Sequence, residues 1–150
     1  MSGLTAFVKE SNRIEGILRE PSNDEIDAHK KLLRLSELSA SDLEAFVKVI
    51  APGHQLRRHV GLDVRVGNHI APPGGMNIVV KLDELLEDAR DGDPYDIHQR
   101  YEHLHPFTDG NGRSGRALWL WMFEQMGISD RVMKLGFLHN WYYASLSHHQ

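Results

Sequence analysis

Cysteine is absent from the sequence. Its absence excludes disulfide bonds, thiol catalysis and cysteine-ligated zinc. It also fits a reducing compartment, so we expect a cytoplasmic protein. A surplus of basic residues is lacking too, because the formal net charge is -4, and no global field favours nucleic acid. No segment approaches the roughly 18 apolar residues of a membrane span. Neither nucleic acid nor a membrane is therefore an expected partner.

The residues that are present describe an ordinary globular protein. Of the 150 residues, 41% are apolar and 25% are charged, which is enough apolar material for a core. No internal repeat or low-complexity segment divides the chain. We therefore expect one domain over residues 1–150.

Helical periodicity runs through most of the chain. A helix is expected over residues 4–17, with Gly16 as its candidate C-cap. Capping boxes at Ser22-x-x-Glu25 and Ser41-x-x-Glu44 predict the starts of the second and third helices. Asp93-Pro94 predicts the N-cap and first residue of a later helix. The remaining predicted helices cover residues 79–89, residues 113–126, a short segment from Ser129, and residues 137–146.

One segment, residues 62–73, departs from the helical pattern. Val60, Val64, Val66 and Ile70 are separated by even numbers of residues, and glycine and proline punctuate them. This pattern predicts a β-hairpin. Two short strands do not form an independent sheet, so the hairpin must rest on a helical body. The predicted fold class is therefore all-α, a bundle of about seven or eight helices with one hairpin.

The stretch from His105 to Arg116 is the most informative part of the sequence. It reads His-Pro-Phe-Thr-Asp-Gly-Asn-Gly-Arg-Ser-Gly-Arg and leads into an apolar run. Glycine adds nothing to a core and costs backbone entropy, so this loop is suited to bringing backbone N–H groups close to a ligand. A glycine loop feeding a helix N-terminus is the geometry that binds phosphate. Gly110 and Gly112 let N–H groups converge on an anion, and Asn111 can donate its amide to a phosphate oxygen.

The charged residues of the stretch have complementary roles at such a site. Arg113 and Arg116 share a helix face, and an anion between them relieves their repulsion. Asp109 is typical of the lone carboxylate that holds Mg²⁺ beside phosphates. His105 can accept a proton near neutral pH, as a hydroxyl attacking a phosphate requires. Each residue alone has a common structural explanation, but the contiguous set favours a function.

His105-Pro-Phe-x-Asp-Gly-Asn-Gly-Arg-x-x-Arg116 resembles the full signature of the Fic family, His-Pro-Phe-x-Asp/Glu-Gly-Asn-Gly-Arg-x-x-Arg. The resemblance implies a helical Fic fold and transfer of AMP from ATP to a Ser, Thr or Tyr hydroxyl of a target protein. It makes His105 the base on that hydroxyl and Asp109 the Mg²⁺ ligand. The implied nucleotide ligands are Gly110, Asn111, Gly112 and Arg113 for the α- and β-phosphates, and Arg116 for the γ-phosphate.

The resemblance extends to the predicted hairpin. Fic proteins carry a β-hairpin "flap" upstream of the motif, which pairs with the backbone of the target, and residues 62–73 occupy that place. Strand addition to a free edge is largely independent of the partner's sequence. The expected contact edge consists of Val66, Gly67, Asn68, His69 and Ile70.

The N-terminal helix carries a third point of resemblance. Ser11-x-x-x-Glu15-Gly16 looks like the Fic inhibitory motif, Ser/Thr-x-x-x-Glu-Gly/Asn, and on a helix Ser11 and Glu15 share a face. The resemblance implies that Glu15 pairs with Arg116 and keeps the γ-phosphate from seating productively. Residues 4–17 would then be an inhibitory helix of the N-terminal type.

Three functions remain open at this point. The first is AMP transfer restrained by Glu15, and the second is removal of AMP from a modified protein, with Glu15 positioning the attacking water. The third is a catalytically silent module that binds nucleotide or a partner. Gly112 favours the adenylylating branch, since the related Doc proteins carry Lys there and phosphorylate instead. Fic proteins often self-associate, although no seam in the sequence compels a homo-oligomer.

Two further interpretations concern residues outside the motifs. Arg57, Arg58 and His59 have the pattern of a solvated patch. Asn140-Trp141-Tyr142-Tyr143 falls where Fic proteins often place a C-terminal helix near the adenosine, so a tyrosine there is a candidate for the base pocket.

Overall fold

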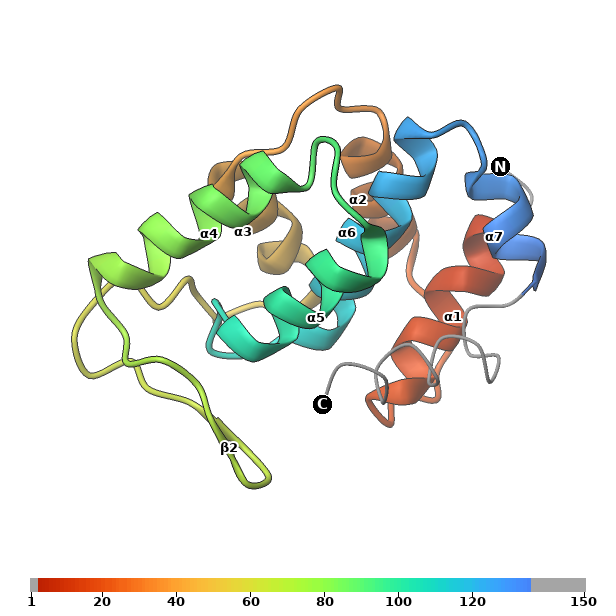
Figure 1. The fold of residues 1–150 in the computed structure, drawn as a ribbon. Helices are drawn as coiled ribbons and strands as arrows, with labels where there is room; N and C mark the ends of the chain where they lie inside the picture. The colour runs from red at the N-terminus through yellow and green to blue at the C-terminus, as the bar shows by residue number, and fades with distance from the viewer. Residues whose placement is uncertain (1–2, 136–150) are drawn as a thin grey trace.

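The structure is a computed structural model that describes residues 3–135. Seven helices and one two-stranded hairpin make up this part of the chain (Figure 1). The elements are α1 (Leu4–Ile14), α2 (Asn23–Leu33), α3 (Ala40–Ile50), β1 (Arg65–Val66), β2 (His69–Ile70), α4 (Met76–Asp88), α5 (Pro94–Leu104), α6 (Asn111–Gln125) and α7 (Ser129–Leu135). The predicted all-α fold with one hairpin is confirmed. The helix expected over residues 137–146 lies outside the described residues.

Helix α6 is the central helix of the bundle. It contacts α1, α2, α3, α5 and α7, and every residue from Arg113 to Phe123 is buried. Trp119 and Trp121 are both buried although they lie on different faces, because neighbouring helices enclose this part of α6 on all sides. No helix in the described part of the chain is long and apolar enough to cross a membrane.

The predicted start signals of α2 and α5 are confirmed. The Ser22 hydroxyl accepts the Glu25 backbone N–H at 3.1 Å, and the Glu25 carboxylate accepts the Ser22 N–H at 2.9 Å. These two bonds are the reciprocal capping box. Asp93 caps α5 through the Tyr95 backbone N–H at 3.1 Å, with Pro94 as the first helical residue.

The predicted start of α3 is wrong by two residues. The capping box is formed by Ser39 and Asp42 and not by Ser41 and Glu44, with Ser39 N–H bonded to Asp42 Oδ2 at 2.9 Å. An aspartate serves the box as well as a glutamate when its carboxylate reaches the N-cap backbone. Glu44 is thereby left to pair with Arg58, at 2.5 Å.

The hairpin projects from the helical body between α3 and α4 (Figure 1). Its strands are antiparallel, with Arg65 opposite Ile70 and Val66 opposite His69. Gly67 has φ +57° in the connecting turn, a left-handed conformation that glycine adopts without steric cost. Each strand has two residues, so the ladder is shorter than the predicted segment of residues 62–73.

Replacing the observed cap tests the position of the α3 start. Ser39→Ala removes the hydroxyl that accepts the Asp42 N–H, and we expect the free energy of unfolding in urea to fall by about 1 kcal/mol. Ser41→Ala is the matched control, because Ser41 lies inside the first turn and alanine has a higher helix propensity. A larger loss for Ser41→Ala than for Ser39→Ala would contradict the assignment.

Candidate functional site

The loop from His105 to Gly110 joins α5 to α6 through two left-handed residues. His105 has φ +46° and is the one non-glycine residue with positive φ among those described, while Gly110 has φ +81°. A Cβ at Gly110 would lie 3.2 Å from the Cβ of Ala51. Glycine is therefore needed at position 110 for both its conformation and its small size, and the backbone of the α6 N-terminus stays open to the site.

Asn111 holds the loop in shape. Its Oδ1 accepts the Phe107 N–H at 2.9 Å, and its Nδ2 donates to the Phe107 carbonyl at 2.8 Å. The side chain is buried, and both ends of its amide are engaged with one peptide unit. The direct contact with phosphate expected of Asn111 stays a prediction; in this structure it is a scaffold for the loop.

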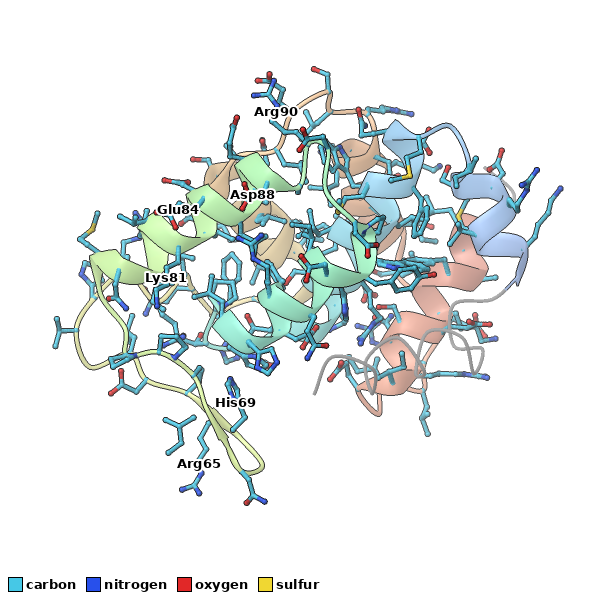
Figure 2. All side chains as sticks on the ribbon, viewed as in Figure 1. Arg65, His69, Lys81, Glu84, Asp88 and Arg90 are labelled. Atoms are coloured by element: carbon cyan, nitrogen blue, oxygen red, sulfur yellow. The ribbon has the colours of Figure 1, made fainter. Side chains whose placement is uncertain are left out.

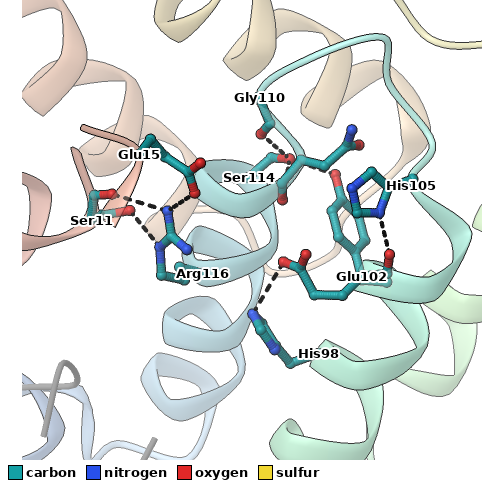
Figure 3. Close-up of polar contacts among 10 residues, drawn as sticks. Ser11, Glu15, His98, Glu102, His105, Gly110, Ser114 and Arg116 are labelled. Carbon is teal, nitrogen blue, oxygen red and sulfur yellow. Dashed lines mark hydrogen bonds and ion pairs between the residues drawn. The ribbon is translucent and has the colours of Figure 1, made fainter. Parts of the chain in front are cut away.

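A buried hydroxyl pair also supports the loop. The Ser114 hydroxyl donates to the Gly110 carbonyl at 2.8 Å and lies 2.7 Å from the Tyr101 hydroxyl (Figure 3). These contacts fasten the first turn of α6 to α5. Neither residue was predicted from the sequence, because neither stands at a fixed position of the motif.

His105 lies between the end of α5 and the cavity. Its Nδ1 contacts the Glu102 carbonyl oxygen (Figure 3). A carbonyl only accepts hydrogen bonds, so Nδ1 carries the proton in the neutral ring and Nε2 keeps its lone pair. Burial lowers the pKa of His105, and the charges of His69 and Arg57 lower it further. His105 is thus suited to accept a proton at Nε2 near neutral pH.

Arg116 is bound by the N-terminal helix. Its Nε donates to the Ser11 hydroxyl at 2.9 Å, and its Nη2 donates to the Ser11 carbonyl at 2.9 Å and to Glu15 Oε1 at 2.7 Å (Figure 3). The Arg116 residue is 3% exposed, whereas the Glu15 side chain is 39% exposed. The structure therefore brings Ser11, Glu15 and Arg116 together. The helix predicted over residues 4–17 ends earlier, at Ile14, and its C-cap is Glu15, with Gly16 next in a left-handed conformation at φ +76°.

Gly112 makes room for the Glu15 carboxylate. A Cβ built at position 112 would collide with Glu15 Oε1 and lie 3.2 Å from Arg116 Nη1. The carboxylate consequently lies against the first turn of α6, where unpaired N–H groups and the helix dipole attract an anion. Glu15 occupies the kind of place that a phosphate oxygen would take.

The position of α1 depends on a network around Glu25. Glu25 accepts hydrogen bonds from Arg19 at 2.6 Å and from Asn12 at 3.1 Å, besides its own capping bond. Burial alone would raise the pKa of Glu25, but these donors hold it at about 2. The carboxylate therefore stays charged and fixes α1 on α2, which brings Glu15 to Arg116.

Arg113 does not share its partner with Arg116. Its Nη1 donates to the Ile50 carbonyl at 2.7 Å, at the C-terminal end of α3, and its Nε has no hydrogen-bond partner among the described residues. A cation at a helix C-terminus is favourable. The unpaired Nε keeps a donor available, but the guanidinium is buried and its observed role is to fasten α6 to α3.

Asp109 is the acidic residue of the loop, and it is open to solvent. Its side chain is 61% exposed, with Oδ2 3.6 Å from His54 Nε2 and Oδ1 accepting the Gly110 N–H at 2.8 Å. The described residues contain no cluster of three side chains that would enclose a metal. A single exposed carboxylate beside a phosphate-binding turn nevertheless fits Mg²⁺, which keeps several waters and takes phosphate oxygens as ligands.

A second carboxyl group approaches Arg116 from α5. Burial raises the pKa of Glu102 to about 7, against the opposing effect of Arg116. His98 Nε2 lies 3.5 Å from Glu102 Oε1, but burial lowers the pKa of His98 to about 3. The contact therefore joins a neutral imidazole to the carboxyl group and is not an ion pair at neutral pH.

These groups line one cavity of about 900 Å³. Its wall is built from the end of α1, the hairpin, α5, the loop and the first turn of α6. The volume lies within the range of small-molecule sites. The cavity brings together Glu15, His105, Asp109, Gly112 and Arg116.

The hairpin lies beside the proton-accepting end of the cavity. His69 Nε2 is 2.8 Å from the His103 carbonyl, and the His69 ring centroid is 6.3 Å from that of His105. Figure 2 shows His69 on the side of the hairpin that faces α5, with Arg65 pointing away from the body. Ile70 is exposed, and no partner strand pairs with the outer edges of the hairpin among the described residues.

Two interpretations outside the motifs have different outcomes. Arg57 was expected in a solvated patch, and this is wrong, because Arg57 is fully buried. Its neighbour Arg58 is partly exposed and pairs with Glu44. The segment Asn140–Tyr143, proposed to line a base pocket, lies outside the described residues.

The chain matches a known protein family over about two thirds of its length. The sequence model of the Fic/DOC family matches residues 23–123. The chain is similar to proteins named "Protein adenylyltransferase Fic" from three insects. It is 28% identical over 98 residues to that of Aedes aegypti, covering 60% of the chain and 19% of the relative. For Culex quinquefasciatus the identity is 30% over 100 residues, with the same coverages, and for Drosophila mojavensis it is 29% over 89 residues, covering 54% and 17%.

The matches cover part of this chain and a small part of each relative. The chain spans about a fifth of the length of these relatives. Residues 4–17, which include Ser11 and Glu15, precede the range matched by the family model. The contact between α1 and Arg116 is therefore supported by the hydrogen bonds in this structure and not by the family match.

The pKa of His105 gives the site a measurable signature. Burial disfavours the charged imidazolium, so we expect the folded protein to show a His105 titration below the ordinary value of about 6.5. The measurement is an NMR titration of the imidazole C2–H signals, assigned with His105→Gln. The same residue in the urea-unfolded chain should titrate near the ordinary value, and a folded-state pKa at or above it would contradict the burial described here.

Proposed function

The chain belongs to the Fic/DOC family, and from that premise we propose that it is an enzyme that transfers AMP from ATP to a Ser, Thr or Tyr hydroxyl of a protein. The observation that carries the proposal is the arrangement in one cavity of a proton-accepting His105, an anion-binding α6 N-terminus and the buried Arg116. In the reaction the target hydroxyl oxygen attacks the α-phosphorus. The bond to the β-phosphate oxygen breaks, pyrophosphate leaves, and the hydroxyl proton passes to His105 Nε2.

The triphosphate would lie over the first turn of α6. Gly110, Asn111 and Gly112 line the cavity at the helix start, where an anion is favoured. The Gly110 N–H donates to Asp109 Oδ1 in this structure, so it would have to exchange that partner for a phosphate oxygen. Arg113 would contribute its unpaired Nε, and Arg116 would bind the γ-phosphate. Mg²⁺, when bound at Asp109, would neutralise part of the phosphate charge.

The hairpin would bind the target protein. Residues Val66 to Ile70 cover the turn and parts of both strands, and the outer edge of each strand has no partner strand among the described residues. An extended segment of the target would add to one of these outer edges as a further strand. The contact of His69 with α5 supports this role, since it holds the edge at a fixed place beside His105. Chemistry of this type requires the acceptor oxygen to be held within hydrogen-bond reach of the base.

We further propose that Glu15 keeps this enzyme inactive. Its carboxylate accepts from the same Arg116 guanidinium that the γ-phosphate needs, and it lies against Gly112 where a phosphate would sit. Two anions cannot share this place without strong repulsion. ATP would bind productively only after the end of α1 has moved.

Removing the Glu15 carboxylate tests both proposals. We expect Glu15→Gly to raise the rate of AMP incorporation from labelled ATP, self-modification included, by at least about tenfold, since about 1.4 kcal/mol suffices for that factor. Glu20→Gly is the matched control, because Glu20 is exposed and pairs only with Lys9 among the described residues. Adding His105→Ala to Glu15→Gly should abolish incorporation.

The same experiment separates the alternatives. A Glu15→Gly variant no more active than the parent would contradict the inhibition. If the parent instead releases AMP from a protein already modified, and Glu15→Gly does not, the reaction runs in the direction of removal, with Glu15 positioning the water. Its partly exposed carboxylate beside the phosphate-binding turn is the observation that favours this second candidate.

The role of Asp109 is tested by the metal requirement. In the Glu15→Gly background, Asp109→Asn keeps the acceptor oxygen for the Gly110 N–H but loses the charge that binds a cation. We expect the concentration of Mg²⁺ needed for half-maximal AMP transfer to rise by at least about tenfold. Direct Mg²⁺ binding to the ATP-loaded His105→Ala protein, followed by calorimetry, gives a readout that does not need turnover. An unchanged Mg²⁺ requirement would contradict the assignment.

A further inference from the structure

Arg57 is a buried arginine whose hydrogen bonds go to backbone carbonyls. It is 0% exposed, and its side-chain donors are satisfied by the carbonyls of Leu62, Pro72, Leu104 and His105. Burying a guanidinium is costly unless its charge and donors are met. Two segments of the chain far apart in sequence thus meet at one side chain.

The first segment is the C-terminal end of α5. Arg57 Nε donates to the His105 carbonyl at 2.6 Å, and Nη2 donates to the Leu104 carbonyl at 2.8 Å. The Arg57 backbone N–H adds a bond to the Pro106 carbonyl at 2.8 Å. Carbonyls at a helix end lack intrahelical partners and attract a cation. Three consecutive carbonyls around the catalytic histidine are therefore fixed by one residue, where His105 holds its left-handed conformation.

The second segment is the base of the hairpin. Arg57 Nη1 donates to the Leu62 carbonyl at 3.0 Å and to the Pro72 carbonyl at 2.8 Å. Leu62 and Pro72 lie at the two ends of the hairpin segment. The Arg57 carbonyl in turn accepts the Gly75 N–H at 2.9 Å, at the start of α4. The two ends of the hairpin are closed by the same guanidinium that holds His105.

The planar fork of arginine is what allows this arrangement. Its donors point in fixed and diverging directions, so one group can satisfy several carbonyls on opposite sides. A lysine ammonium would retain the charge but not this geometry. The hairpin touches α5 at another point, through His69 and the His103 carbonyl at 2.8 Å. Because the hairpin is attached at its base and near its tip, both its orientation and its distance relative to α5 are fixed.

We infer that Arg57 is a positioning residue for AMP transfer, which fixes the edge of the hairpin relative to His105 and so places the acceptor hydroxyl against the base. The inference rests on the proposed function, because it assumes that the hairpin holds the target. A displacement of about 1 Å between the two parts is enough to lower the rate of a positioned reaction about a hundredfold. Arg57 acts on this geometry without touching either substrate.

The test uses Arg57→Lys in the Glu15→Gly background, with Arg58→Lys as matched control. Arg58 is the adjacent arginine, and its ion pair with Glu44 lies at the surface. The acceptor is the protein itself, in self-modification with labelled ATP. We expect the maximal rate to fall at least tenfold, with the half-saturating ATP concentration changing less than threefold. Amide hydrogen exchange should accelerate in residues 62–73 and 104–107 and remain unchanged in α2 and α6.

Other outcomes would overturn the inference. A maximal rate equal to that of the Glu15→Gly protein would overturn it. Faster hydrogen exchange in all helices, together with weakened ATP binding, would also overturn it, since that pattern indicates a role in folding alone. A second variant, Arg57→Ala, should recover part of the rate on addition of guanidinium ion and not of methylammonium. Failure of both variants to fold would likewise assign Arg57 to stability and contradict the inference.

The outcome for Arg57 can be separated from that for the proposed function. If Glu15→Gly with Arg57 intact transfers no AMP, the proposed function fails by itself. In that case the hydrogen-exchange measurement by itself tests whether Arg57 couples the hairpin to the His105 segment. Acceleration confined to the hairpin and the His105 segment supports the coupling, and unchanged exchange overturns it.

Discussion

The buried positive charge of Arg116 determines which groups must surround it in the site. The guanidinium belongs to Arg116, a residue 3% exposed on the second turn of the central helix. A buried cation must be met by an anion and by acceptors, and Ser11 and Glu15 meet it from α1. The contact ties the first helix of the chain to α6. An ATP γ-phosphate would offer the same charge at the same place, so the interaction that stabilises the free protein is also the one that ligand binding would have to replace.

Two other buried arginines differ from Arg116 in the kind of partner that they bind. Arg57 and Arg113 donate to carbonyls at the ends of α5 and α3, and such backbone acceptors do not leave when a ligand arrives. They hold the hairpin, the loop and α6 in fixed places around the cavity. Of the three, Arg116 is the one whose partner is a carboxylate on a partly exposed segment. This difference between Arg116 and the other two arginines is the structural basis of the proposed inhibition.

Local signals in the sequence predicted much of this. The capping box at Ser22, the N-cap at Asp93 and the hairpin are each determined within a few residues, and each was predicted in place. The start of α3 was wrong because Ser39 and Ser41 head equally plausible boxes, and local chemistry does not choose between them. The burial of Arg57 was missed because its acceptors come from residues up to 48 positions away, and its neighbours Arg58 and His59 resemble a solvated patch. The role of Asn111 in holding the loop was not predicted either. The sequence does not show that both backbone groups of Phe107 point toward the Asn111 amide.

The most direct test measures whether Glu15 and Arg116 stabilise the free protein through their interaction with each other. Unfolding free energies are determined in urea, without nucleotide, for the parent, Glu15→Gln, Arg116→Gln and the double variant. We predict a coupling free energy of about 1 to 3 kcal/mol, because each single change leaves its partner without a counter-charge. Effects that add to within about 0.5 kcal/mol would mean that the two side chains are independent, and the proposed inhibition would lose its physical basis.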